Sequence, residues 1–157
     1  MIHVVDTIDP AAAIEPLVVD PRLGRVHGIA LSDAAPRLFA TAYEGGLSIY
    51  DLPGQRFLGE PFAAAAGDDG LAYVEGALYG IGGDRLTRYV LDADQARVVR
   101  SEVIVHEHES FNDPRDVWAE PGRLTCLANM ELDPVAPHRR GRAATDTSLL
   151  EVQLPAR

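Results

Sequence analysis

The sequence predicts an all-β protein made of β-propeller blades, each a four-stranded antiparallel meander, arranged as an incomplete ring of about three blades per chain. One observation behind this prediction is a strand module that starts near Gly28 and recurs near Gly70 and Asp116, at spacings of 42 and 46 residues. The other is that each module holds short runs of alternating apolar and polar residues, punctuated by Gly, Pro, Asn and Asp. This alternation has the period of strands, whereas helical repeats would show a period of 3.6 residues.

The chain is expected to form one propeller domain over residues 1–157 that opens with half a blade. The segments IHVVDT and PLVVD match only the third and fourth strands of a unit, so two strands are expected there. The turns SDAAP, EGG and PGQ separate four strands in the first full unit, and EG, GGD and DADQ separate four in the second. The third unit supplies three strands. The expected blades cover approximately residues 1–24 (half), 25–66, 67–112 and 113–157, the last with an insertion at 131–146.

This strand count leaves the ring open. Two, four, four and three strands make about three and a quarter blades, whereas propellers close with roughly four to eight. An open ring would leave a row of unpaired backbone donors and acceptors at its edge. Three arrangements remain: a piece of a longer propeller, a ring completed by another copy or another chain, or an open stack. Two copies would form six blades with one spare strand per chain.

Composition restricts the function classes. The formal net charge is −10, from 24 acidic against 14 basic residues, and an acidic surface repels nucleic-acid backbones. No run of about 18 apolar residues is present, so no membrane partner is expected. The N-terminus lacks the pattern of a secretory signal, which predicts a cytoplasmic location. The single Cys126 lies in an apolar strand pattern and is expected to be a buried, inert thiol.

Three polar residues share one position in the repeat. His27, Asp69 and Arg115 each stand immediately before the first strand of their unit. In a closed ring they would surround the mouth of the central channel, where convergent polar groups form the usual ligand site of this architecture. They are therefore candidate residues for binding a small ligand. The alternative is that they are ordinary turn residues, as Asp before Gly often is.

The insertion at 131–146 is long for a hairpin connection, and long loops in compact domains tend to be functional or disordered. It contains Arg139 and Arg140, with His138 and Arg142 beside them. By the topology of a meander, this loop lies at the same end of the blades as His27. Because the guanidinium group of Arg is a planar fork, Arg139 and Arg140 could bind a carboxylate or phosphate. A solvated loop is the alternative.

A second candidate site is the alternating run His106, Glu107, His108 and Glu109. On a strand, His106 and His108 would point to the same side. Such a pair can bind zinc or another transition metal if a third ligand is available. No other His or Cys has a recognisable ligand spacing, and a solvated loop would explain the run equally well.

The segments HVVDT and VHGIALSDAAPRLFATAYEGGLSIYDL resemble the repeats of YVTN-type and lactonase-like bacterial β-propellers. The run Phe111–Val117 also resembles the Asn-Asp segment of gluconolactonase-like enzymes, which hold a divalent metal in the central channel. This resemblance implies Asn112 and Asp116 as metal ligands. The sequence departs from that family at Arg115, because a cation there would oppose metal binding.

Two functions from different classes follow. The first is a non-catalytic binding or scaffold module without a cofactor, for a protein or a small ligand, completed by self-association, a partner chain or a missing segment. The second is a lactonase-like hydrolase that depends on a divalent metal such as Ca, Mg or Zn, with a site at the channel mouth. The sequence contains no nucleophile elbow, phosphate-binding loop or Cys pair, so the binding module is the leading interpretation.

Overall fold

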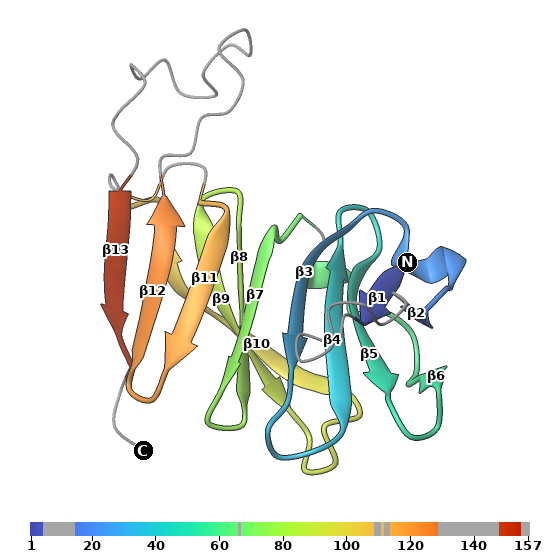
Figure 1. Cartoon of the computed structure of the whole chain (residues 1–157). Coiled ribbons are helices and arrows are strands. Elements are labelled where there is room, and N and C mark those ends of the chain that lie inside the picture. Colours follow the sequence, from blue (N-terminus) through green and yellow to red (C-terminus); the bar gives the residue numbers. More distant parts are fainter. Residues whose placement is uncertain (5–14, 66, 109–110, 112–113, 129–147, 155–157) are drawn as a thin grey trace, which may run out of the picture.

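The computed structural model describes residues 1–4, 15–65, 67–108, 111, 114–128 and 148–154. In this part of the chain the structure is all-β, with antiparallel sheets stacked side by side in chain order (Figure 1). The predicted fold class, a set of partial-propeller blades without closure, is confirmed. No helix in the described segments is long and apolar enough to cross a membrane.

Each sheet is a meander of consecutive strands. The N-terminal strand pair consists of β1 (Ile2–Val4) and β2 (Glu15–Val18). The first sheet contains β3 (Val26–Leu31), β4 (Arg37–Ala42), β5 (Gly46–Asp51) and β6 (Arg56–Phe57). The second sheet contains β7 (Gly70–Val74), β8 (Ala77–Gly82), β9 (Arg85–Leu91) and β10 (Val98–His106). The third sheet contains β11 (Asp116–Glu120), β12 (Arg123–Ala128) and β13 (Ser148–Gln153).

The first strand of each sheet is its inner strand. Strand β7 lies beside both β3 and β11, so the three inner strands adjoin one another (Figure 1). Glycine allows this close approach. A Cβ atom on Gly28 would lie 2.9 Å from the backbone nitrogen of Leu71, and one on Gly70 would lie 2.8 Å from the Cα of Asp116. The recurring glycine of the sequence repeat is therefore required by the distance between inner strands.

Apolar side chains fill the space between successive sheets. We call the face of a sheet toward the preceding sheet its front face, and the opposite face its back face. Between the first and second sheets, Phe39 is fully buried, and its ring stacks on that of Tyr73 at 5.7 Å between centroids. Three clusters make up the core: Ile2, Val18, Leu38 and Tyr50; Phe39, Leu47, Leu71 and Tyr89; and Ile81, Leu86, Val117 and Leu124, each with further neighbours.

Some local features differ from the sequence-based expectation. The fourth strand expected in the first full unit is limited to the two residues of β6. After it, the small-residue segment Ala63–Ala65 forms a short 3-10 helix, η2. A second 3-10 helix, η1 (Pro21–Leu23), follows the N-terminal strand pair. Cys126 is fully buried, as expected, and burial raises the pKa of its thiol to about 11.

Candidate functional site

The residues predicted to surround the channel mouth lie together at one end of the inner strands. His27 lies in β3, while Asp69 and Arg115 immediately precede β7 and β11. Each comes from a different sheet, and we call the three the mouth site. The sequence repeat brings them together, because equal register in adjoining inner strands places equivalent residues side by side.

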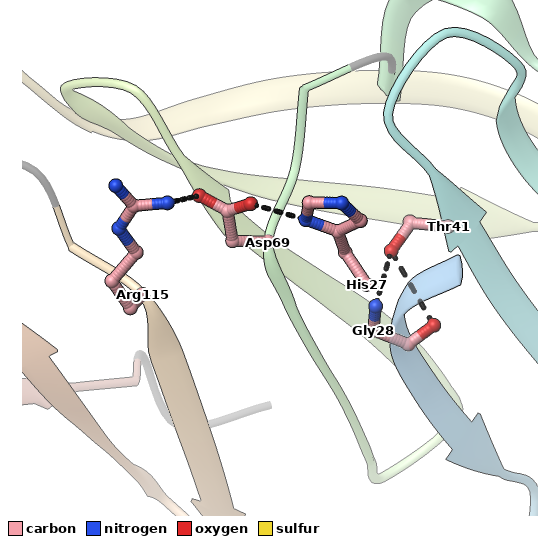
Figure 2. Close-up of polar contacts among 5 residues, drawn as sticks. All are labelled: His27, Gly28, Thr41, Asp69 and Arg115. Atoms are coloured by element: carbon pink, nitrogen blue, oxygen red, sulfur yellow. Dashed lines mark hydrogen bonds and ion pairs between the residues drawn. The ribbon is translucent and has the colours of Figure 1, made fainter. Parts of the chain in front are cut away.

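Asp69 bridges the other two residues of the mouth site (Figure 2). Nδ1 of His27 lies 2.7 Å from Oδ1 of Asp69, and Nη1 of Arg115 donates to Oδ2 of Asp69 at 3.1 Å. A carboxylate only accepts hydrogen bonds, so Nδ1 of His27 carries the proton in this contact. The side chains of His27, Asp69 and Arg115 are 27%, 13% and 38% exposed, so the bridge is partly shielded from water.

A bulge in β3 sets the position of His27. The pairing of β3 with β4 passes from Val26–Ala42 to Gly28–Thr41, which leaves His27 as the extra residue. Such bulges redirect a side chain that would otherwise follow the pleat of the sheet. The buried hydroxyl of Thr41 accepts from the amide of Gly28 at 3.1 Å and donates to its carbonyl oxygen at 3.4 Å (Figure 2).

A cleft of about 250 Å³ opens at the mouth site. Arg115 contributes a hydrogen-bond donor to its wall, His27 an imidazole ring, and Asp69 and Asp116 contribute carboxylates. The glycines of the repeat let the main chain form the rest of the wall. The lining residues are His27, Gly28, Ile29, Asp69, Gly70, Leu71, Arg115 and Asp116.

A buried acid lies next to the mouth site, and the sequence analysis missed it. Asp68 has a fully buried side chain whose Oδ2 accepts a hydrogen bond from the hydroxyl of Tyr89. Nη2 of Arg85 lies 3.8 Å from its Oδ1. Burial raises the pKa of Asp68 to about 6. Tyr89 could have pointed to this contact, because a tyrosine in the core normally needs a partner for its hydroxyl group.

We expect Asp68 to make the stability of the protein depend on pH. Its pKa is about 6 in the fold, against 3.8 for an ordinary aspartate, so between these values the folded state binds more protons than the unfolded state. The unfolding free energy should therefore fall as the pH rises from 4 to 6, by about 3 kcal/mol at most, and then level off. Urea unfolding across this range should show the decline in the wild type but not in Asp68→Asn. Parallel profiles for the two proteins would contradict this assignment.

The remaining candidate residues fall into two groups. Asn112, Arg139 and Arg140 lie outside the described residues, and so does the insertion at 131–146. Asp116 lies in the wall of the cleft, where its Oδ1 accepts from the backbone nitrogen of Val117 at 2.9 Å. Its role as a metal ligand stays a prediction.

The predicted pair of histidine ligands is arranged differently from the expectation. Nε2 of His106, at the end of β10, lies 3.7 Å from Oδ1 of Asp84 in the β8–β9 turn. Asp84, His106 and Glu107 bring potential ligand atoms within 4.8 Å of one another, and in the described segments this is the group that could hold an ion. It includes neither His108 nor Asp116. Asp84 is half-buried, His106 and Glu107 are exposed, and such surface groups are common without a bound ion.

Solved structures of other proteins share the architecture of this chain. Neither a family model nor a curated relative matches the chain. Among solved structures, an aldose sugar dehydrogenase from Streptomyces coelicolor in its PQQ-bound form is similar, with 21% identity and a TM-score of 0.53, covering 82% of this chain and 42% of that one. An oxidoreductase from Thermus thermophilus, assigned as a glucose dehydrogenase, has 22% identity and a TM-score of 0.54, covering 80% and 43%. A luciferin-regenerating enzyme has 17% identity and a TM-score of 0.53, covering 82% and 45%.

These similarities agree with the stacked sheets and define the type of fold. The chain has a β-propeller-type fold, with inner strands that carry a polar site at one end. It spans less than half the length of the solved structures that it matches. At these identities the likeness concerns the fold alone.

Proposed function

We propose that this chain is a non-catalytic β-propeller binding module, and that its mouth site binds a small polyhydroxyl ligand. The observation that carries the proposal is the bridge through Asp69, which holds His27 from the first sheet and Arg115 from the third at the wall of one cleft. A site assembled from three separate sheets is pre-organised, so a ligand does not have to order it on binding.

The charges of the cleft favour a neutral ligand over an anion. The two carboxylates of Asp69 and Asp116 outnumber the single guanidinium of Arg115, and the whole chain carries a net charge of −10. An anion would meet both the local carboxylates and the acidic field of the protein. A hydroxyl group both donates and accepts, so a polyhydroxyl molecule can pair with His27, Arg115 and the carboxylates at once. Two of the similar solved structures are sugar dehydrogenases by name, which makes a monosaccharide the natural probe.

A titration with D-glucose, followed by amide NMR spectroscopy, tests this proposal. We expect the amide signals of Gly28, Gly70 and Leu71 to shift, because these residues line the cleft. Asp69→Asn should raise the glucose dissociation constant at least about tenfold, since it removes the charge that holds His27 and Arg115 in place.

Glu102→Gln is the matched control, because it makes the same carboxylate-to-amide change in a different ion pair. Glu102 lies in β10, with its Oε2 3.5 Å from Nη1 of Arg88. The control should bind glucose like the wild type. The proposal is wrong if the cleft amides do not respond to glucose, or if Asp69→Asn binds as well as the control.

A lactonase-like hydrolase that depends on a divalent metal is the second candidate. The position of Asp116 in the wall of the cleft favours it. The guanidinium of Arg115 opposes it, because a fixed cation beside Asp69 would repel a metal ion in the same cleft. This candidate requires the purified chain to retain a stoichiometric divalent ion and Asp116→Ala to lose it, which elemental analysis would detect.

A further inference from the structure

Among the described residues, the back face of the third sheet lacks the cover that the other two back faces have. Segments 47–52, 86–91 and 149–154 are equivalent third strands. Leu47 and Leu86 begin the first two and are 1% and 0% exposed, because each is covered by the next sheet. Leu149 holds the same position in the third sheet and is 68% exposed.

On all three back faces, the equivalent cross-strand pair contains one aromatic side chain. In the first two sheets the paired residues are an alanine on the inner strand and an aromatic residue on the next strand, Ala30 with Phe39 and Ala72 with Tyr79. In the third sheet the sizes are exchanged, and Trp118 on the inner strand pairs with Thr125. Phe39 and Tyr79 are 0% and 5% exposed, whereas Trp118 is 49% exposed. The back face of the third sheet therefore carries a large aromatic side chain at a position that the next sheet covers in the first two sheets.

The front face of the first sheet also carries exposed apolar side chains. Ile29 and Leu31 on β3 are 52% and 61% exposed, whereas Leu71, the equivalent of Ile29 in the second sheet, is 6% exposed. Within the described segments, the N-terminal strand pair covers the outer part of this front face, over Leu38 and Tyr50. This part of the chain therefore carries one exposed back face and one partly exposed front face.

We infer that two copies of this chain associate as a dimer. In this dimer, the third sheet of each copy packs with its back face on the front face of the first sheet of the other copy. The contact repeats the one that already joins successive sheets within the chain, in which a front face packs on a back face. Leu31 of one copy would meet Trp118 of the other, as Tyr73 meets Phe39 within the chain. A partner with a different surface would not continue this packing.

The geometry of the stack favours closure into a dimer. Because a front-to-back contact is heterologous, it produces a ring if the rotation closes and a fibre if it does not. Two copies with three sheets each fall within the roughly four to eight blades at which propellers close. No strand in the described residues pairs with the outer edge of β13, and the N-terminal strand pair of the second copy would lie beside that edge.

Solution mass with matched variants provides the first test. Light scattering on the chain should give twice its 16.9 kDa mass. Trp118→Lys and Leu31→Asp should each weaken the dimer at least about thirty-fold, as expected for a central apolar anchor. Val103→Lys is the control, because Val103 is 57% exposed on β10, away from both faces. A folded wild-type monomer would overturn the inference, as would a dimer that survives both variants.

Cross-linking between copies tests the orientation of the contact. Chains with Leu31→Cys and chains with Trp118→Cys, mixed in equal amounts and oxidised, should form a disulfide-linked dimer. Mixing Leu31→Cys with Val103→Cys should not, and the native Cys126 is fully buried and cannot interfere. Equal yields from the two mixtures would exclude the proposed contact. All three mouth-site residues belong to one chain, so a monomer that binds glucose would overturn this inference and leave the proposed function standing.

Discussion

Phe39→Ala is expected to lower the free energy of unfolding by about 3–5 kcal/mol, the usual cost of removing a buried aromatic ring. Phe39 is fully buried between the first and second sheets, where its ring stacks on Tyr73. Because the ring lies between these two sheets, the resulting cavity lies in the contact between blades. Urea denaturation followed by circular dichroism measures the loss.

Val103→Ala is the matched control for this substitution, since the side chain of Val103 is 57% exposed on β10. It should change the unfolding free energy by less than about 0.5 kcal/mol. If Phe39→Ala cost no more than the control, the first and second sheets would not pack through Phe39, and the stacked arrangement would be wrong.

Gly70→Ala is expected to cost about 1–3 kcal/mol, the usual penalty for forcing an extra methyl group into a packed site. The new Cβ would lie 2.8 Å from the Cα of Asp116 and 3.0 Å from the carbonyl oxygen of Arg115. Neither is the end of a flexible side chain, so β7 and β11 would have to separate. The same separation would move Arg115 away from Asp69. Thermal unfolding would report the loss of stability, and the side-chain NMR signals of Arg115 the change at the mouth site.

Gly45→Ala provides the comparison, because Gly45 lies in a turn where an added Cβ would approach the Cβ of Ala42 at 3.3 Å. A small local shift relieves a contact of this length, so we expect a much smaller loss of stability. Equal losses from the two substitutions would show that the distance between inner strands does not require glycine at position 70.

The sequence repeat predicted the inner strands and the meeting of the mouth-site residues for one physical reason. A fixed register places equivalent residues at the same height in adjoining strands, so His27, Asp69 and Arg115 could be grouped without coordinates. Their hydrogen bonds could not be predicted in the same way. The contact of His27 with Asp69 depends on the bulge in β3, and a bulge adds one residue without a distinct sequence pattern.

Contacts between different parts of a blade were the hardest to predict. Asp68 and Tyr89 lie 21 residues apart and meet because the segment before β7 lies against Gly80 of β8, where the absence of a side chain leaves room for both groups. The pairing of His106 with Asp84 likewise depends on where β10 ends relative to the β8–β9 turn. The alternation of His106 and His108 does not continue as a strand, because β10 ends at His106 and Glu107 has a positive φ of 54°. It also carried no information about the neighbouring turn that supplies Asp84.

Short distances between inner strands give the most direct test of the central claim, which is that β3, β7 and β11 adjoin around one axis. In a nuclear Overhauser spectrum, an α-proton of Gly28 should show a cross-peak to the amide proton of Leu71, because a Cβ on Gly28 would lie 2.9 Å from that nitrogen. An α-proton of Gly70 should likewise show a cross-peak to the α-proton of Asp116. If both signals were missing while the cross-peaks between paired strands of each sheet were present, the sheets would exist without the stacked arrangement, and the account would be contradicted.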